Sequence, residues 1–515
     1  MDQYDCIVIG SGIGGLVAAG LLAQAGQRVL VCESHAIAGG AAHSFGHQGF
    51  TFDSGPSFYC GLGDVASRNP LTQVLAKLGE TLETVAYDPL GHYHFPGRAG
   101  AQAFPVYGKC DRYRQALAQV TPQGVQQFAR FERRLLRLYE ALKGISVLDI
   151  RPDSKGIASL LVKHPLGLAK LLLQLPKVQR SVGQVMDATV SDPWVRRLID
   201  LECFLLSGLN AHGTIAPEVA FMLGERTTTV IDYPIGGSGA IVAALLRGLR
   251  RFGGELRLKA HVAEIVLAGD RAVGVRLRGV SGPGKAGGEV ILGKRIISNA
   301  TRWDTFAKLL PEKSLPTVSN TVSPEPAWAN EQAQALRVPA VESFMHLHLG
   351  IRSGGLPHLT GHHVVVHTDD QPVTTPGNTC MISIPSVWDP NLAPAGHHVI
   401  HAYTLEPFAG WVRDGGYGAQ KRAKAETLYR ALEQVIPDIR SRIALELIGT
   451  PLTHASYLRR HQGTYGPAIV AGQGRFPGPK TTIENLYCVG DSTMPGIGVP
   501  AVTASGIFCA NMLTG

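Results

Sequence analysis

The chain has 515 residues, of which 45% are hydrophobic and 17% are charged, as in an ordinary globular protein. This length accommodates two or three domains with large cores. The formal net charge of +8 can attract nucleic acid or anionic lipid. The sequence contains no block of lysine and arginine interleaved with aromatic residues, so we expect no nucleic-acid partner and favour lipid.

The cysteines and the apolar pattern exclude further classes. The eight cysteines are scattered and include no C-x-x-C pair, which predicts reduced structural thiols in a cytosol-like compartment. The sequence contains no run of about 18 apolar residues, so no transmembrane helix is predicted. The N-terminus lacks a basic segment followed by an apolar stretch, so we expect no signal peptide and a fold that begins near residue 4.

The N-terminal segment carries a dinucleotide fingerprint. A buried strand leads into a glycine turn, an apolar helix at 16–25 and a second strand at 28–32 that ends before Glu33. The turn lets the backbone approach a pyrophosphate, and the helix N-terminus attracts the phosphates. Glu33 can accept hydrogen bonds from ribose hydroxyls and would repel a 2′-phosphate, which favours FAD or NAD over NADP. The predicted cofactor residues here are Gly10, Gly12, Ile13, Gly14, Gly15, Glu33 and Ser34.

Two further glycine-containing motifs follow. Gly39-Gly40-Ala41 comes soon after Glu33, and Gly55-Pro56 follows a predicted strand that ends near Asp53. The glycine pair resembles the extended motif of FAD-binding amine oxidases and carotenoid desaturases, in which it lies close to the cofactor diphosphate. In those families the Asp-x-Gly step lies near the flavin. The resemblance therefore implies FAD contacts for Gly39, Gly40, Ala41, Gly55 and Pro56.

The C-terminal end of the chain carries a second set of cofactor-binding signals. A short strand precedes Gly490-Asp491, and the small, apolar stretch at 502–513 predicts a helix after Gly498-Val499. In the resembling families this aspartate contacts the ribityl-phosphate part of FAD. The helix N-terminus points at the flavin there, and its dipole favours an anionic reduced ring. No second G-x-G-x-x-G follows a strand, so NAD as the principal cofactor, or a Rossmann unit that binds nothing, is the weaker alternative.

Residues from about 80 to 225 read as an insertion with helices at 111–120, 123–143 and 193–206. Within it, residues 156–177 are rich in leucine, carry Lys163, Lys170 and Lys177, and contain no acidic residue. Pro165 and Pro176 are expected to break this stretch into short helices. Such helices can lie in a bilayer interface with their lysines reaching outward. A core or tunnel-wall helix pair is the alternative.

Strands dominate the rest of the chain. An alternating strand is predicted over 254–266, and others over 271–278, 295–300, 344–349, 381–386 and 397–404. In the resembling families Val262 offers its backbone to the adenine, and the strand ending at Asn299 turns near FAD. His346 and His348 share one strand face, but no carboxylate or third histidine stands at a suitable spacing. We therefore interpret them as satisfied sheet histidines and predict no metal.

Together these motifs resemble the carotenoid isomerase and phytoene desaturase family, which includes retinol saturase. The resemblance covers nearly the whole chain, and the segments 385–390 and 463–467 are most similar to the carotenoid-isomerase-like branch. It implies an α/β fold: a Rossmann-type FAD-binding domain of the glutathione-reductase or amine-oxidase kind, with an inserted α+β substrate domain. The FAD-binding domain comprises residues 1–80, 225–305 and 475–515. The substrate domain comprises 81–224 and 306–474, with membrane-contacting helices near 156–180.

The resemblance implies an FAD-dependent oxidoreductase or isomerase acting on a carotenoid or related long polyene. The reaction that the resemblance implies is cis–trans isomerisation with reduced flavin, or desaturation or saturation of C–C bonds. A polyene offers no hydrogen-bonding group, so its binding rests on apolar area, at about 25 cal/mol per Å². The cofactor carries the chemistry, so no catalytic acid or base is assigned; Asp53 and His461 are conceivable but are interpreted as structural.

The expected partners are a hydrophobic polyene, a peripheral membrane surface, and a quinone or O2 as electron donor or acceptor, in a cytoplasmic or plastid-stromal location. Two other functions are considered. A flavin amine oxidase acting on a small amine would need an acidic or aromatic-caged pocket, and the Leu/Lys stretch argues mildly against it. A non-catalytic flavoprotein that binds or assembles pigments would hold a flavin that no relevant donor reduces.

Overall fold

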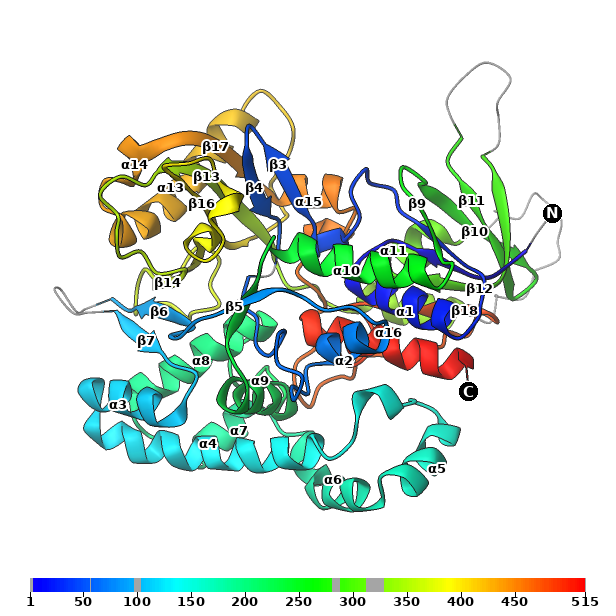
Figure 1. Ribbon diagram of the computed structural model, residues 1–515, viewed down its shortest axis with the longest axis horizontal. Helices are drawn as coiled ribbons and strands as arrows, with labels where there is room; N and C mark the ends of the chain where they lie inside the picture. Colours follow the sequence, from blue (N-terminus) through cyan, green and yellow to red (C-terminus); the bar gives the residue numbers. More distant parts are fainter. Residues whose placement is uncertain (1–2, 56, 97–102, 280–287, 312–327, 515) are drawn as a thin grey trace.

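The computed structural model describes residues 3–55, 57–96, 103–279, 288–311 and 328–514 (Figure 1). Within these residues the strands form two seven-stranded sheets and two short two-stranded ladders. The first sheet lies on the right in Figure 1 and the second at the upper left, and a group of helices lies below them.

The first sheet, which we call the cofactor sheet, joins the two ends of the chain. Its strands run in the order β10-β11-β12-β1-β2-β9, with β18 also paired to β12. The end of β12 pairs in parallel with β1 and β18, whereas its beginning pairs antiparallel with β11. The bounds are β1 Tyr4–Ile9, β2 Val29–Cys32, β9 Glu255–Arg257, β10 Val262–Ala268, β11 Arg271–Leu277, β12 Val290–Ser298 and β18 Leu486–Cys488.

Helix α1 (Ile13–Gln24) packs against β1 and β2 of the cofactor sheet. Helices α10 (Ser238–Arg251) and α16 (Val499–Thr514) pack on α1, and α2 (Pro70–Lys77) packs on α10 and α16. Helix α1 is apolar on every side because α10 and α16 both cover it. The α1–α16 contact is so close that a Cβ at Gly506 would lie 2.5 Å from the carbonyl oxygen of Gly14. The C-terminal helix therefore packs directly on the start of the fingerprint helix.

The second sheet, which we call the substrate sheet, is almost entirely antiparallel. Its order is β17-β13-β16-β15-β14-β6-β7, with a parallel pairing between β6 and β14. Helix α13 (Tyr417–Val435) covers one face, with α14 (Ile439–Arg442) beside it. The strands are β6 Gly91–His94, β7 Phe104–Val106, β13 Ser343–Arg352, β14 His362–Val366, β15 Thr379–Ser383, β16 His397–Glu406 and β17 Ile443–Gly449.

The β3–β4 hairpin (Ser44–His47 and Phe50–Asp53) packs on the substrate sheet through a contact of β4 with β16. Strand β5 (Thr84–Ala86) pairs with β8 (Asp232–Pro234), which joins residues on either side of the domain boundaries predicted from the sequence. Three further helices are α11 (Arg302–Asp304), which runs into a π-helical turn at Thr305–Leu309, α12 (Ala329–Arg337) and α15 (Pro451–Tyr457).

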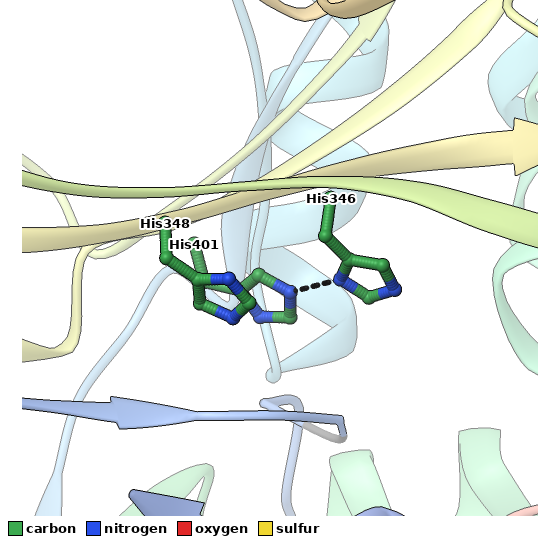
Figure 2. A group of neighbouring side chains, drawn as sticks. All are labelled: His346, His348 and His401. Carbon is green, nitrogen blue, oxygen red and sulfur yellow. Dashed lines mark hydrogen bonds between the residues drawn. The ribbon is translucent and has the colours of Figure 1, made fainter. Parts of the chain in front are cut away.

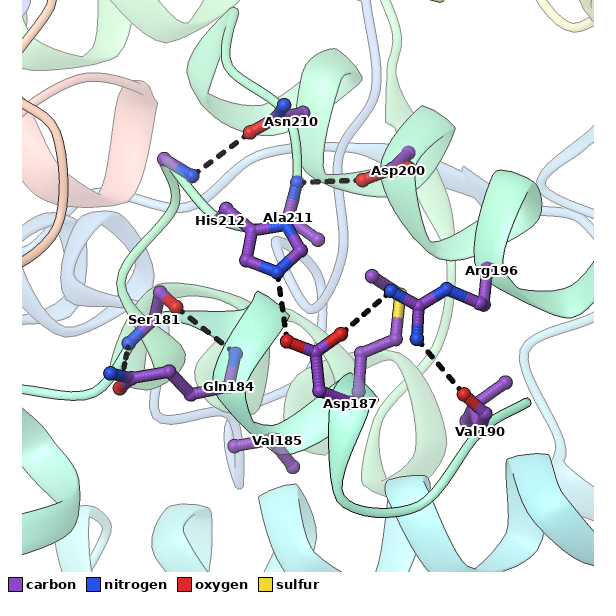
Figure 3. Close-up of polar contacts among 12 residues, drawn as sticks. Ser181, Gln184, Val185, Asp187, Val190, Arg196, Asp200, Asn210, Ala211 and His212 are labelled. Atoms are coloured by element: carbon purple, nitrogen blue, oxygen red, sulfur yellow. Dashed lines mark hydrogen bonds and ion pairs between the residues drawn. The ribbon is translucent and has the colours of Figure 1, made fainter. Parts of the chain in front are cut away.

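The helical group corresponds to the insertion that was predicted from the sequence. Polar caps mark its helix starts: Thr121 accepts from the N–H of Gly124 at α4, and Asp192 accepts from that of Val195 at α8. Figure 3 shows how Asp187, at the end of α7, accepts hydrogen bonds from Arg196 of α8 and His212 of the following loop. The group comprises α3 Cys110–Val120, α4 Pro122–Leu142, α5 Ser154–Lys163, α6 Pro165–Val178, α7 Val182–Asp187, α8 Pro193–Ser207 and α9 Ala216–Thr228.

Two sequence predictions need correction. The strand predicted over 254–266 is two strands, because Lys259 adopts a φ of 55° and turns the chain between β9 and β10. The turn lets the N–H of Ala260 donate to the carbonyl of Glu33 at 2.8 Å. Pro165 begins α6, as a helix-starting proline can, but Pro176 lies within α6 and does not end it.

Helices α5 and α6 meet at 118°. Among the described helices none is long and apolar enough to cross a bilayer alone, although α5 and the first part of α6 pass that test of length and composition as a bent pair.

Candidate active site

A cavity of about 680 Å³ lies at the carboxyl ends of the parallel strands of the cofactor sheet. Residues that directly follow β1, β2, β12 and β18 line it, which is where open α/β sheets bind their ligands. The cavity continues to the face of the substrate sheet, where side chains of β13 and β16 line it. One cavity therefore connects the predicted cofactor turns with the second sheet.

The structure brings the predicted cofactor residues together at this cavity. Gly15 is the exception among the described ones: it lies beneath the turn, where a Cβ would come within 2.5 Å of the carbonyl oxygen of Gly10. Pro56 lies outside the described residues. The residues that line the cavity are Gly10, Gly12, Ile13, Gly14, Glu33, Ser34, Gly39, Gly40, Ala41, Gly55, Val262, Asn299, Gly490, Asp491, Gly498 and Val499.

The glycine turn leaves no room for side chains. Gly10 has a φ of +90°, which L side chains rarely adopt. A Cβ on Gly12 would lie 2.5 Å from the side-chain nitrogen of Asn299, and one on Gly14 would lie 3.1 Å from the backbone nitrogen of Gly490. The two ends of the chain thus form one backbone-lined cradle at the N-terminus of α1, which suits a diphosphate.

Glu33 is buried, and its carboxylate accepts hydrogen bonds from neighbouring protein groups. Its carboxylate accepts from the N–H and Oγ of Ser11 at 2.8 and 2.6 Å and from the N–H of His35 at 2.7 Å. These bonds fix the carboxylate at the cavity wall. Sequence reasoning missed Ser11, although its place between the fingerprint glycines was a signal.

Cationic side chains near the cradle were also missed. Arg460 forms an ion pair with Asp491 and donates to the carbonyl oxygens of Thr464 and Tyr465 at 2.8 and 3.1 Å. Arg278 and Lys308 also line the cavity. Arg460 and Lys308 are each paired with a carboxylate of the cavity wall, that of Asp491 and that of Asp304 respectively. Nothing in the local sequence pattern distinguished these cations from surface ones.

The two acid–base candidates named from the sequence, Asp53 and His461, do not line the cavity. Asp53 is buried; its carboxylate accepts from Ser44 Oγ at 2.6 Å, Tyr233 Oη at 2.9 Å and the N–H of Ser238 at 3.0 Å. Burial raises the pKa of Asp53 and these hydrogen bonds oppose the rise. The carboxylate thereby ties the β3–β4 hairpin to the start of α10. His461 stacks on Trp303, with 4.9 Å between ring centroids, and does not line the cavity.

The far wall of the cavity contains histidines that the sequence did not bring together. Antiparallel pairing of β13 with β16 places His401 opposite His348 (Figure 2). The same pairing places Tyr403 opposite His346. Helix α15 adds His454, whose Nε2 contacts Nε2 of His346. The expectation that no third histidine accompanies His346 and His348 was wrong, because strand partners 55 residues apart are not visible as a spacing.

These features define an α/β dinucleotide-binding protein: a parallel sheet, a glycine turn opening a buried helix, an acidic residue after the second strand, and a second glycine turn from the far end of the chain. The chain belongs to the family of flavin-containing amine oxidoreductases, which matches residues 13–514.

Comparison with individual relatives places the chain more closely within this family. A chloroplastic prolycopene isomerase of Daucus carota is 36% identical over 99% of this chain and 80% of its own length. A prolycopene isomerase of Arabidopsis thaliana is 35% identical, covering 99% and 82%. A lycopene-forming phytoene desaturase of Paracoccus is 25% identical, covering 98% and 96%. The resemblance to the carotenoid isomerase and phytoene desaturase family is confirmed.

Solved structures confirm the predicted fold class. A putrescine oxidase superposes with a TM-score of 0.59 at 15% identity over 99% of both chains. A cyclohexylamine oxidase of Brevibacterium oxydans gives 0.57 at 16% identity, covering 99% of this chain and all of its own. At these identities the likeness concerns the fold alone.

Proposed function

We propose that this protein is an FAD-dependent enzyme that acts on a carotenoid or related long polyene, by cis–trans isomerisation. The observation that carries the proposal is full-length identity of 34–36% to prolycopene isomerases, against 25% to phytoene desaturases. Desaturation or saturation of C–C bonds is the alternative reaction on the same kind of substrate.

The residues of the cavity fit FAD. The cradle from Gly10 to Gly14, with Gly39 and Gly40, would hold the diphosphate, Glu33 the ribose, and the backbone at Val262 the adenine. Asp491 would face the ribityl phosphate, and the N-terminus of α16 at Val499 would face the flavin ring. Bound FAD supplies a centre that accepts or returns a hydride.

The far end of the cavity suits an apolar substrate. Phe344 and Tyr403 of the substrate sheet line the cavity, as do Tyr465 and Ile497, and these side chains offer the area that a polyene needs in place of hydrogen bonds. Burial raises the pKa of Tyr403 to about 12, so this wall carries no tyrosinate at neutral pH. The protein's own part is to align the polyene and exclude water.

Purified protein loaded with FAD tests the reaction. We expect reduced holoenzyme under argon to convert prolycopene into isomers with fewer cis bonds, as resolved by chromatography, and oxidised holoenzyme to convert little. Consumption of phytoene with transfer of electrons to a quinone or O2 would favour desaturation. Release of peroxide on addition of a small amine, without any change in carotenoids, would contradict the proposal in favour of an amine oxidase.

We also propose that α5 and α6 rest on an anionic bilayer surface, from which a lipid-soluble substrate would be taken. Six large hydrophobic side chains of these helices are exposed: Ile157, Leu161, Val162, Leu166, Leu172 and Leu173. Lys155 and Lys170 are exposed beside them, and the segment 154–178 contains no acidic residue. Apolar side chains with flanking lysines are typical of interfacial helices. Such a surface would place the protein on a cytoplasmic or plastid-stromal membrane face.

Vesicle flotation tests this surface. Leu166 and Leu173 are 78% and 77% exposed, so Leu166→Glu with Leu173→Glu should leave the fold intact while abolishing flotation with anionic vesicles. Val412→Glu is the matched control, because Val412 is 62% exposed but lies outside these helices. Unchanged flotation of the double variant would contradict the proposed surface without affecting the proposed reaction.

A further inference from the structure

Four arginines lie on the outer side of helix α4. They are exposed and follow one another at intervals of three and four residues, so they share one side of the helix. We call these residues the arginine face: Arg130, Arg133, Arg134 and Arg137. The other exposed residues of α4 before Glu140 are uncharged. One helix side therefore carries a charge equal to half of the formal net charge of +8.

The protein does not neutralise the arginine face. The carboxylates of α4 pair with other cations: Glu132 is buried against Arg114, and Glu140 lies 2.6 Å from Nζ of Lys143. Among the described residues, none forms an ion pair or a hydrogen bond with a member of the arginine face. The four guanidinium groups therefore keep their donors for an anion from outside the described chain.

The spacing of the arginines opposes the helix that carries them. Arg130 and Arg134 are like charges four residues apart, as are Arg133 and Arg137, and such pairs destabilise a helix. Helix α4 forms because its opposite side is buried and packs on α9, where Tyr139 Oη donates to Glu225 at 2.6 Å. An anionic surface against the arginine face would replace this repulsion by attraction.

The arginine face adjoins the surface that we propose for α5 and α6. Helix α4 contacts α6, and both contact α9. A Cβ on Gly167 of α6 would lie only 2.4 Å from the carbonyl oxygen of Gly144, two residues after α4 ends. Leu166, beside Gly167, is 78% exposed. In Figure 1, α4, α5 and α6 lie together along the lower edge of the molecule, with α9 above them.

The chemistry of these neighbouring helices selects an anionic bilayer as the partner. Arginine binds phosphate oxygens through paired N–H donors. A nucleic acid also offers phosphates, but it would leave the exposed leucines of α6 in water. A bilayer offers phosphates at its surface and an apolar layer directly beneath them, which is the combination that basic helices with exposed apolar side chains bind.

We propose that the arginine face binds the phosphate groups of anionic lipids and thereby fixes how the protein lies on the bilayer. This inference rests on the contact proposed for α5 and α6, in which the apolar side chains enter the interface. The arginines add the attraction to negative charge, which acts before contact is made. Contact through α5 and α6 alone would leave the protein free to tilt, and the second contact on α4 removes that freedom.

Vesicle flotation of the full chain tests the arginine face. For Arg133→Gln with Arg137→Gln, we expect partition onto vesicles of phosphatidylcholine and phosphatidylglycerol to fall by about 30-fold, the effect of two basic side chains at an anionic surface. Glutamine is as good a helix former as arginine, and the change removes like-charge pairs. The melting temperature of this variant should therefore not fall.

Arg250→Gln with Arg422→Gln is the matched control. Both arginines are exposed, lie on α10 and α13, and lower the net charge by the same amount when replaced. We expect this control to partition as wild type does. Arg133→Lys with Arg137→Lys keeps the charge and should keep most of the binding.

Salt gives a second readout. Wild-type binding should weaken as salt is raised, because the Debye length falls from about 10 Å at 0.1 M to about 3 Å at 1 M. The glutamine variant of the arginine face should depend less on salt, since it has fewer charges to screen. Vesicles of phosphatidylcholine alone should bind wild type weakly.

Three results would overturn the inference: unchanged partition of the glutamine variant, an equal loss in the control, or equal binding of wild type to vesicles with and without phosphatidylglycerol. Wild type that binds duplex DNA through these arginines but binds no vesicle would replace the lipid by a nucleic acid.

The experiment separates the arginine face from the proposals around it. Flotation requires neither FAD nor a polyene, so failure of the proposed reaction leaves its outcome unaffected. If Leu166→Glu with Leu173→Glu floats normally and the glutamine variant does not, the arginine face stands and the α5–α6 contact fails. If only the leucine variant loses flotation, the α5–α6 contact stands and the arginine face is overturned.

Discussion

The two sheets meet the same cavity in different ways. The cofactor sheet contributes the turns that follow its parallel strands, and those turns offer mainly backbone N–H groups and glycines. The substrate sheet contributes side chains from the middle of β13 and β16. A turn is encoded by consecutive residues, whereas a sheet face is assembled from strands that lie far apart in the chain. The difference explains why the first half of the site is readable as a motif and the second half is not.

The two sides also tolerate polar groups differently. On the cofactor side, buried Glu33 is satisfied by backbone and hydroxyl donors of neighbouring turns. On the substrate side, buried His346 pairs with His401, 55 residues away. In the helical group, buried Glu202 of α8 pairs with buried Arg226 of α9. Removing one member of a buried side-chain pair leaves the other member buried without its partner. We therefore expect a larger loss of stability from such a change than from removing one of the several donors to Glu33.

The largest expected effect comes from breaking the buried ion pair of the helical group. Glu202→Gln should lower the free energy of unfolding by about 3–5 kcal/mol, because it leaves the buried Arg226 guanidinium, now 2.9 Å from Glu202, without its counter-charge. Urea unfolding followed by tryptophan fluorescence measures this loss. The control is Glu426→Gln, which removes a half-exposed pair with Arg440 and should cost about 1 kcal/mol or less. Equal losses in both variants would contradict the contrast.

A pH series tests the buried histidines of the substrate sheet. Burial lowers the pKa of His348 to about 4, so as pH falls from its ordinary pKa near 6.5 the unfolded chain binds a proton that the folded one refuses. Stability attributable to this residue should therefore be constant above about pH 6.5 and fall by about 3 kcal/mol by pH 4. His348→Gln should flatten that dependence, as measured by unfolding midpoints. The control variant His358→Gln, at an exposed position, should leave the pH dependence of the unfolding midpoint unchanged. If this control also flattened the pH dependence, the effect could not be assigned to His348.

On the cofactor side, Gly12→Val should weaken FAD binding by about 100-fold, since overpacking costs about 1–3 kcal/mol. The new side chain would meet Asn299 at 2.5 Å and fill the cradle. Titration of FAD fluorescence measures the dissociation constant. Gly354→Val is the control, because a Cβ there meets nothing within 4 Å. Normal FAD binding by Gly12→Val would show that the cofactor lies elsewhere.

The smallest expected effect concerns the half-exposed Asp187 in the helical group (Figure 3). Hydrogen bonds from His212 and Arg196 lower the pKa of Asp187. Its contribution, about 1 kcal/mol or less because the pair is solvent-screened, is present above its ordinary pKa and is lost as pH falls through the lower folded value. The stability difference between wild type and Asp187→Asn should accordingly be constant at neutral pH and shrink below about pH 4. A difference that grows on acidification would contradict this.

The amino-acid sequence by itself determined the cofactor side. Gly10 to Gly15, Glu33, Gly490 and the helix after Gly498 are local signals, because turn geometry and helix starts depend on neighbouring residues. Their meeting at one cavity follows from the parallel pairing of β1 with β12 and of β12 with β18.

The tertiary structure alone decided the rest. The break at Lys259, the pairing of Arg460 with Asp491, and the row of His454, His346 and His401 depend on contacts between distant segments. Strand register and helix packing set those contacts, and each is fixed by the burial of whole faces rather than by any one motif. For that reason the sequence indicated the turns that could bind a dinucleotide, and the folded chain decided which other side chains line the same cavity.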